Sequence, residues 1–152
     1  MFQVPTKTQY AIRALVHLVR HSAASAGAIA EAEHISPKYL EGILAQLKAA
    51  GLVVSDRGRM GGYRLTRNPF TIPMLDVVKA MEGEVRLVEC VGEGGACFAA
   101  SGCLPRKFWL GLKQTVDTYL TSVSLGDIAE VDSSEGIPSV ADRPASQTQI
   151  KE

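Results

Sequence analysis

The segment from residue 36 to 51 constrains the fold more than any other part of the chain. Ser36 is a candidate N-cap, Pro37 suits the first turn of a helix, and Gly51 is a typical helix stop. Between them the apolar residues recur with the i, i+3, i+4, i+7 spacing of one helical face: Leu40, Ile43, Leu44 and Leu47. The pattern predicts an amphipathic helix that buries one side against its neighbours.

Two more helices are predicted before this one. Residues 8–21 gather small and aliphatic side chains on one helical face, and residues 25–33 form a short, Ala-rich helix. A tight turn at His34 and Ile35 joins the second helix to the third. This is the pattern of a helix-turn-helix, in which the first turn of the last helix enters the DNA major groove and points Lys38 and Tyr39 outward. The same pattern also suits an ordinary helical hairpin.

The residues after Gly51 favour the DNA-binding interpretation. Residues 52–55 and 63–66 read as the two strands of a hairpin, joined by a Gly-rich loop that carries Arg57 and Arg59. Glycines allow the tip of such a loop to approach a phosphate backbone or enter a minor groove, and the arginines supply positive charge. A hairpin in this position is the wing of a winged helix-turn-helix.

The charge of the chain is unevenly divided, although the 16 basic and 16 acidic side chains balance overall. Residues 1–70 hold nine basic and four acidic side chains, a net charge of +5, and the remainder holds seven and twelve, a net charge of −5. A basic half suits contact with phosphates, although a solvated charged face would have the same composition.

The second half predicts a short helix within residues 71–84, a loop over residues 86–103 and a long helix over residues 105–123. The long helix carries an apolar seam at spacings of three and four: Phe108, Leu112, Val116, Tyr119 and Val123. Such a seam packs against another helix, and the chain offers no other segment to cover it. We therefore expect a homodimer through residues 105–123, which suits two-fold DNA half-sites.

The predicted fold is mainly α with a small β-hairpin wing: a winged helix-turn-helix plus a long dimerisation helix. The expected divisions are a DNA-binding domain at 1–70, a connecting helix and cysteine loop at 71–104, a dimerisation helix and terminal turn at 105–130, and a disordered tail at 131–152. The sequence has neither a long apolar run nor a secretory signal, so we expect a cytoplasmic protein with no membrane partner. It shows no catalytic constellation, so we do not expect an enzyme.

Three cysteines lie within the predicted loop. Cys90, Cys97 and Cys103 are separated by six and five residues, and such an odd, clustered set does not resemble a disulfide framework. Close cysteines on a Gly-rich loop suit a soft metal centre, but they do not match the paired C-x2-C pattern of a zinc ribbon. Two other interpretations of the cluster are redox-active thiols and three cysteines without a common role. His17 and His21, four residues apart, are more typical of a partly exposed helix face than of a metal site.

Several stretches together resemble a known family. They are residues 7–15 (KTQYAIRAL), residues 35–41 (ISPKYLE), residues 50–53 (AGLV), the RGxxGGYRL pattern at 57–65, residues 76–83 with the pattern DVVxxMEG, the three cysteines and Trp109. In this order they resemble the Rrf-type family of bacterial winged-helix transcription regulators, which includes IscR, NsrR and RirA. The likeness covers about residues 1–130.

The resemblance implies a homodimer in which three cysteines, placed like Cys90, Cys97 and Cys103, bind a [2Fe-2S] or [4Fe-4S] cluster. The state of the cluster would set operator affinity, so that the protein senses iron, cluster supply, nitric oxide or redox state. Ser36, Tyr39 and Glu41 match the recognition helix, and Arg57 matches the wing arginine that enters the minor groove. The full predicted DNA-binding set is Lys7, Ser36, Pro37, Lys38, Tyr39, Glu41, Arg57, Arg59, Gly61 and Gly62.

One departure from the family concerns the fourth cluster ligand. IscR-like members have a histidine three residues after the third cysteine, where this chain has Arg106, which is not a credible iron ligand. Other members use an acid near the start of the first helix of the partner chain, where this chain has Gln9, which is not an acid. Glu89, Glu93, a small thiol or water remain as candidates, and the cluster type stays open. A zinc- or thiol-based redox sensor on the same scaffold and a protein-binding module are the alternatives.

Overall fold

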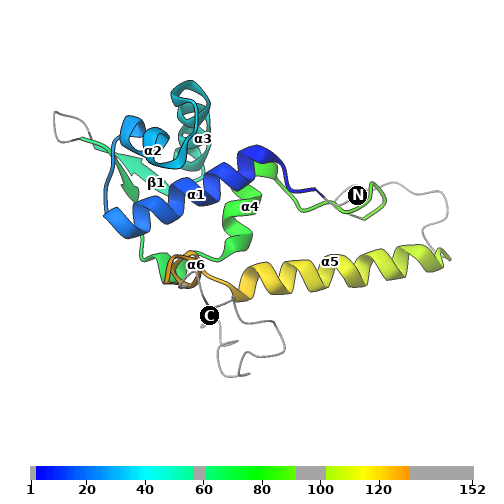
Figure 1. The fold of residues 1–152 in the computed structure, drawn as a ribbon. Helices are drawn as coiled ribbons and strands as arrows, with labels where there is room; N and C mark the ends of the chain where they lie inside the picture. The colour runs from blue at the N-terminus through cyan, green and yellow to red at the C-terminus, as the bar shows by residue number, and fades with distance from the viewer. Residues whose placement is uncertain (1–2, 57–60, 92–101, 131–152) are drawn as a thin grey trace.

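Helix α1 (Thr6–His21) contacts helices from both halves of the chain (Figure 1). This computed structural model describes residues 3–56, 61–91 and 102–130. The buried face of α1 is the predicted one, since Ala11, Ala14, Leu15 and Leu18 are all fully buried. Because its apolar stripe packs against α3, α4 and α6, α1 positions the elements that carry the candidate site.

The predicted helix-turn-helix is present. Helix α2 (Ala26–Glu33) starts at Ser25, whose Oγ accepts a hydrogen bond of 3.1 Å from the backbone N–H of Ala28. After α2 the chain turns at His34, which adopts the left-handed conformation with φ of 53°. Helix α3 (Pro37–Ala49) follows, and Gly51 after it also has positive φ. Ser36 occupies the N-cap position of α3, but its side chain makes no capping hydrogen bond.

The wing consists of strands β1 (Val53–Ser55) and β2 (Tyr63–Leu65), which pair antiparallel with Val54 opposite Arg64. Ala24, in the loop between α1 and α2, extends this sheet. Its N–H donates to the carbonyl oxygen of Tyr63 at 3.1 Å, and the N–H of Tyr63 donates back at 2.8 Å. The base of the wing is therefore fixed to the helical domain.

A 3-10 turn, η1 (Pro69–Thr71), precedes α4 (Met74–Glu82). The sequence predicted one short helix within residues 71–84, but the first part of that stretch is not α-helical. The Asn68 side chain caps η1 by accepting a hydrogen bond from the Phe70 N–H at 2.9 Å, and Pro73 then occupies the N-cap of α4. Gly83, with φ of 76°, ends α4 as predicted.

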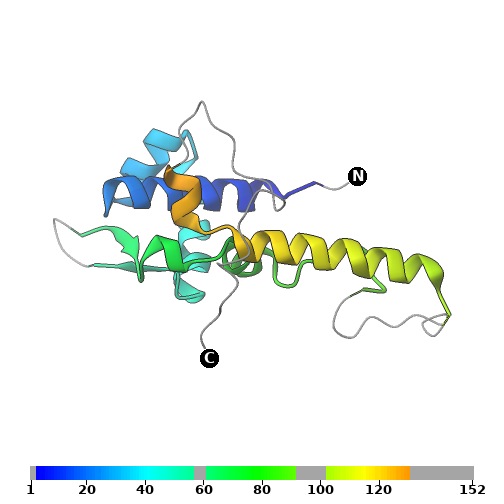
Figure 2. The same cartoon turned by 90° about the horizontal axis from the view of Figure 1, so that it is seen from below.

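Helix α5 (Leu104–Ser122) extends away from the winged domain, and short helix α6 (Leu125–Glu130) returns to it (Figures 1 and 2). Two backbone hydrogen bonds of 2.8 Å fix the end of α5 to the start of α4, from Met74 N–H to the Val123 carbonyl and from Leu125 N–H to the Ile72 carbonyl. In both views the beginning of α5 and the strands of the wing lie at opposite ends of the molecule.

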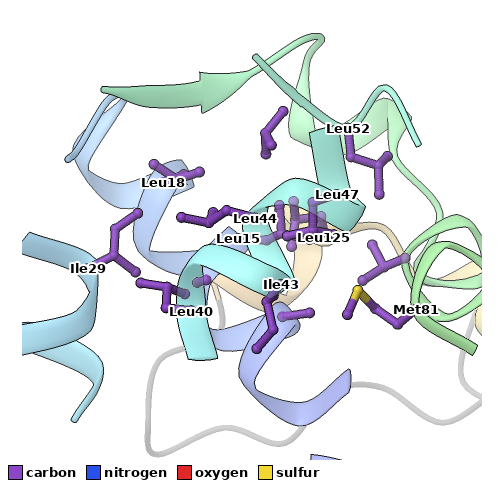
Figure 3. Close-up of a cluster of buried hydrophobic side chains, with 14 of the residues drawn as sticks. Leu15, Leu18, Ile29, Leu40, Ile43, Leu44, Leu47, Leu52, Met81 and Leu125 are labelled. Carbon is purple, nitrogen blue, oxygen red and sulfur yellow. The ribbon is translucent and has the colours of Figure 1, made fainter. Parts of the chain in front are cut away.

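One hydrophobic core joins these elements (Figure 3). The predicted α3 residues Leu40, Leu44 and Leu47 are fully buried, and they pack with side chains from α1, α2, α4 and α6. Each buried leucine contributes about 1.5–3 kcal/mol to folding. Leu125 belongs to this core, so α6 completes the domain that α1 begins. Within the described ranges no helix is long and apolar enough to cross a membrane, and the predicted tail at 131–152 lies outside them.

Candidate DNA interface and cysteine segment

The first turn of α3 presents the residues predicted to meet DNA. Lys38, Tyr39 and Glu41 are exposed, as are Ser36 and Pro37 before them. Leu40 between them is fully buried and holds the turn against the core. The local pattern therefore separates an anchoring side from an accessible one, which is the geometry that a recognition helix needs.

The side chain of Tyr39 is not isolated on this surface. Its ring packs edge-to-face on Tyr10 of α1, with ring centroids 6.0 Å apart and planes at 83°. The guanidinium of Arg13 lies 5.5 Å from the centroid of the Tyr10 ring. Sequence reasoning missed Tyr10 and Arg13 as parts of this surface. Their three-residue spacing placed them on one face of α1, but nothing in the sequence indicated that this face meets α3.

Arg13 also contacts the end of α2. Its Nε donates to Glu33 Oε2 at 3.0 Å, and its Nη2 donates to the Glu33 carbonyl oxygen at 2.6 Å. His17 Nδ1 lies 3.5 Å from the other Glu33 carboxylate oxygen, and the rings of His17 and His21 have centroids 4.3 Å apart with planes tilted by 34°. Across the described residues, no group of three or more His, Cys, Asp or Glu side chains is arranged to hold a metal.

The wing carries polar contacts at its base. Arg64 Nε donates to Asp56 Oδ2 at 2.8 Å, and Lys48 Nζ of α3 donates to Ser55 Oγ at 2.5 Å. Gly61 and Gly62 are half-buried. Arg57 and Arg59, the predicted tip of the wing, lie outside the described residues. These contacts belong to the base of the wing.

Lys7, at the start of α1, belongs to a contact with α4. Its Nζ lies 3.7 Å from Glu82 Oε1, and the hydroxyl of the fully buried Thr8 donates a hydrogen bond to the same carboxylate oxygen. Lys7 therefore has an intramolecular partner at the place where α1 and α4 meet. Its predicted contact with DNA stays a prediction.

Two of the three cysteines lie in the described part of the chain. Cys90 and Cys103 are free thiols and partly buried, while Cys97 lies outside the described residues. Cys103 is the N-cap of α5, and Arg106 in the first turn of that helix donates from Nε to the carbonyl oxygen of Cys90 at 3.2 Å. This hydrogen bond ties the segment that carries Cys90 to the beginning of α5.

The apolar seam of α5 is covered to different degrees along its length. Its end packs on the chain itself, since Val123 is 2% exposed and Tyr119 packs against the core. Leu112 and Val116 line an open groove of about 1010 Å³, which the segment 83–87 also lines. The prediction that no other part of the chain covers the seam was therefore wrong for its final turn. The side chains at the beginning of α5 are exposed to solvent, Leu104 to 73% and Phe108 to 64%.

An ion-pair cluster lies beside this groove. Lys113 Nζ of α5 is 2.6 Å from Asp117 Oδ2 and 3.7 Å from Glu84 Oε1. The hydrogen bond to Asp117 is the main cause that raises the pKa of Lys113 above its usual 10.5. Lys113 therefore links α5 to the segment that leads toward Cys90.

Comparison with known proteins places this geometry in a family. Residues 4–131 match the Rrf2 family, which is described as iron-dependent transcriptional regulators. The chain is 34% identical to the HTH-type transcriptional regulator IscR of Vibrio vulnificus over 129 residues, which cover 83% of this chain and 76% of that protein.

Solved structures show the same fold. CymR, the global cysteine regulator of B. subtilis, superposes with a TM-score of 0.71 at 32% identity, covering 87% of this chain and all of that one. IscR of T. potens superposes with a TM-score of 0.68 at 31% identity, covering 84% of this chain and 85% of that one. The chain belongs to the Rrf2 family and is a DNA-binding transcription regulator, not an enzyme.

Proposed function

We propose that this regulator acts as a homodimer in the cytoplasm and that its operator affinity is set by an iron–sulfur cluster held by Cys90, Cys97 and Cys103. The observation that carries the proposal is the hydrogen bond from Arg106 to the Cys90 carbonyl. It joins the segment of the first cysteine to the helix that begins at the third. Cysteine thiolates are the usual ligands of an iron–sulfur centre.

The residues present fit such a cluster. Both described cysteines are free and partly buried, and Cys103 stands at the N-terminus of a 19-residue helix. A helix N-terminus favours negative charge, which a thiolate-bound centre brings. When bound, the cluster supplies the redox- and ligand-sensitive chemistry, whereas the chain supplies the thiolates and fixes their backbone.

Arg106 acts as a positioning residue in this proposal. A guanidinium has donors only, so it cannot ligate iron. Its hydrogen bond to Cys90 gives a different role to the position where IscR-like members have a histidine. The fourth ligand then comes from Glu89, Glu93, a small thiol or water. Gln9, which is not an acid, donates from its side-chain amide to the Val4 carbonyl at 2.8 Å.

The DNA interface is proposed as the exposed first turn of α3 together with the wing. Lys38, Tyr39 and Glu41 approach the major groove, and Lys7, Arg57 and Arg59 contact the backbone or the minor groove. Two copies joined through α5 would present two such surfaces to a two-fold operator. Leu104 and Phe108, exposed at the start of α5, supply the apolar area for that contact.

A second candidate is a thiol-based redox sensor on the same scaffold. The free thiols of Cys90 and Cys103 on two segments joined by Arg106 favour it. Oxidation of a pair of such thiols to a disulfide would change the same region without a metal, with the two electrons passing to a cellular oxidant such as a peroxide or another disulfide. A zinc-bound form of the same cysteines belongs to this class.

The experiment that separates these proposals is the absorption spectrum of protein purified without oxygen, with analysis of iron, sulfide and zinc. A cluster gives absorbance between roughly 320 and 450 nm, together with acid-labile sulfide. The holo and apo forms are then compared for binding to a duplex that the protein selects from a random-sequence library. The cluster proposal fails if the spectrum is featureless and sulfide is absent, or if both forms bind the duplex equally.

A further inference from the structure

We propose that Tyr10 is a positioning residue for DNA recognition, which holds the ring of Tyr39 in place, and that Arg13 holds Tyr10 and the end of α2 in turn. The proposal rests on the assignment of Tyr39 to the DNA interface made above. Tyr10 and Arg13 do not belong to the DNA-binding set predicted from the sequence.

Tyr39 is 44% exposed in the first turn of α3, where Lys38 and Glu41 are also exposed. The ring of Tyr10 meets it edge-to-face at 6.0 Å. Tyr10 is half-buried and packs against the core from α1, so it is the fixed member of the pair. A side chain ordered before binding loses less conformational entropy when it meets its target.

Arg13 connects this pair to the turn of the helix-turn-helix. Its guanidinium lies 5.5 Å from the centroid of the Tyr10 ring, within the range of a cation–π contact. The same guanidinium donates to the side chain and to the carbonyl oxygen of Glu33, the last residue of α2. The carbonyls at the end of a helix lack intrahelical partners and favour a cation. One arginine thus fixes α1 to α2 and contacts the ring that supports α3.

The chain from Glu33 through Arg13 and Tyr10 to Tyr39 therefore crosses all three helices of the DNA-binding motif. The contact of Arg13 with Glu33 joins α1 to α2, and the contact of Tyr10 with Tyr39 joins α1 to α3. The link between them, from Arg13 to Tyr10, lies within α1. The position of the Tyr39 ring relative to the α2–α3 turn is set by α1. The packing of Tyr39 on α1 therefore contributes to the affinity for DNA.

The test is a double-mutant cycle with Tyr10→Leu, Tyr39→Ala and the combined variant in the full chain. Binding is measured to a duplex selected by the wild-type protein from a random-sequence library. Tyr10→Leu is expected to weaken binding about three- to tenfold in the wild-type background and less than twofold in the Tyr39→Ala background. Tyr10→Phe, which keeps the ring, is the matched control and retains binding.

The outcomes distinguish the support of Tyr39 by Tyr10 from the assignment of Tyr39 to the DNA interface. Equal losses from Tyr10→Leu in both backgrounds would overturn the support by Tyr10 and leave the DNA interface intact. Unchanged binding by Tyr39→Ala would overturn the assignment of Tyr39, and the positioning role with it. Thermal unfolding of each variant shows that the compared proteins are folded.

Arg13 is tested by its own pair of variants. If Arg13 holds α2 in place, it needs the planar guanidinium group that donates two hydrogen bonds to Glu33. Arg13→Lys should then weaken DNA binding as much as Arg13→Ala, with an unchanged dependence of log Kd on log salt. As a direct phosphate contact it would be replaced well by lysine, and Arg13→Ala would lower the salt slope by about one. That second result would overturn its positioning role. Arg20→Lys, on the same helix, is the control.

Discussion

Gly62 lies so close to Ala24 that a Cβ atom built on it would be 2.7 Å from the Ala24 carbonyl oxygen and 2.9 Å from its carbonyl carbon. Both atoms are backbone, so neither can rotate away. Next to this contact, Ala24 exchanges two hydrogen bonds with Tyr63. The glycine therefore allows the wing to be attached to the loop between α1 and α2, a role that differs from the predicted approach to phosphate.

We expect Gly62→Ala to lower the free energy of unfolding by about 1–3 kcal/mol, because the added methyl group overpacks a contact between two backbone segments. DNA affinity should fall as well, since the base of the wing must shift. Chemical denaturation and binding to the selected duplex measure the two effects. Gly42→Ala is the matched control, because its Cβ meets nothing within 4 Å in a helix interior, and it should raise stability by about 0.5–1 kcal/mol. Stability unchanged by Gly62→Ala would contradict the close approach.

Lys38→Ala should weaken DNA binding similarly for all sequences. It should also reduce the slope of log Kd against log salt by about one, because one phosphate contact is lost. Lys38 is exposed in the first turn of α3, and no described residue forms an ion pair with it. Titrations at several salt concentrations provide the measurement. Lys79→Ala, an exposed change on α4, should leave the slope unchanged, and a sequence-dependent loss for Lys38→Ala would indicate base contact instead.

Cys97→Ala should abolish the visible absorbance, because it removes one of three thiolates. Arg106→Ala should retain the absorbance but release iron faster to a chelator, because the backbone of Cys90 loses its link to α5. The exposed neighbouring change Lys107→Ala serves as the control. Loss of iron at the wild-type rate in the Arg106 variant would show that this hydrogen bond does not support the cluster.

Phe108→Glu should shift the chain from dimer to monomer and weaken operator binding, because it places a charge in the exposed apolar part of the α5 seam. Analytical ultracentrifugation over a range of concentrations measures the shift. Gln114→Glu adds the same charge to the same helix at an exposed polar position and should leave the dimer intact. A dimer as stable as wild type in the Phe108 variant would exclude this face as the interface.

Lys113→Gln should lower the free energy of unfolding by up to about 1 kcal/mol at neutral pH, because the partly buried Lys113 pairs with Asp117. The pKa of Lys113 is raised in the folded protein. The stability that Lys113 contributes is therefore fully present below its pKa in the unfolded chain, near 10.5, and is lost as the pH rises through its higher pKa in the folded protein. Denaturation at pH 7, 9 and above 11 should show a constant difference that then shrinks. A difference in the free energy of unfolding between wild type and variant that grows with pH would contradict the raised pKa of Lys113.

The helices were predictable because their apolar spacing is strong. The buried face of α3 and the stop at Gly51 follow directly from the order of residues. The break between η1 and α4 was missed because Asn68 and Pro73 act through capping and local backbone geometry, which the apolar period of the segment conceals. Ser36 shows the converse, since its position was predicted correctly but its side-chain cap does not form.

Contacts between segments that are distant in the sequence were harder to predict. The packing of Tyr10 on Tyr39 depends on the angle at which α1 crosses α3, which no local pattern encodes. Similarly, the burial of Val123 depends on the return of α6 to the core, so the seam of α5 looked uniformly uncovered in the sequence. The role of Arg106 could not be found by comparing ligands, because it acts through a backbone carbonyl.

The backbone attachment of α5 at its final turn has a mechanical consequence. A helix of 19 residues is roughly 28 Å long at 1.5 Å per residue. Hydrogen bonds at Met74 and Leu125 hold its final turn, whereas its first turn lies far from the wing. Over this length, a rigid rotation of about 5° about the final turn would displace the first turn by roughly 2.5 Å. A small rotation beside α4 would therefore correspond to a larger displacement of Cys103, and a displacement of Cys103 to a smaller one beside α4.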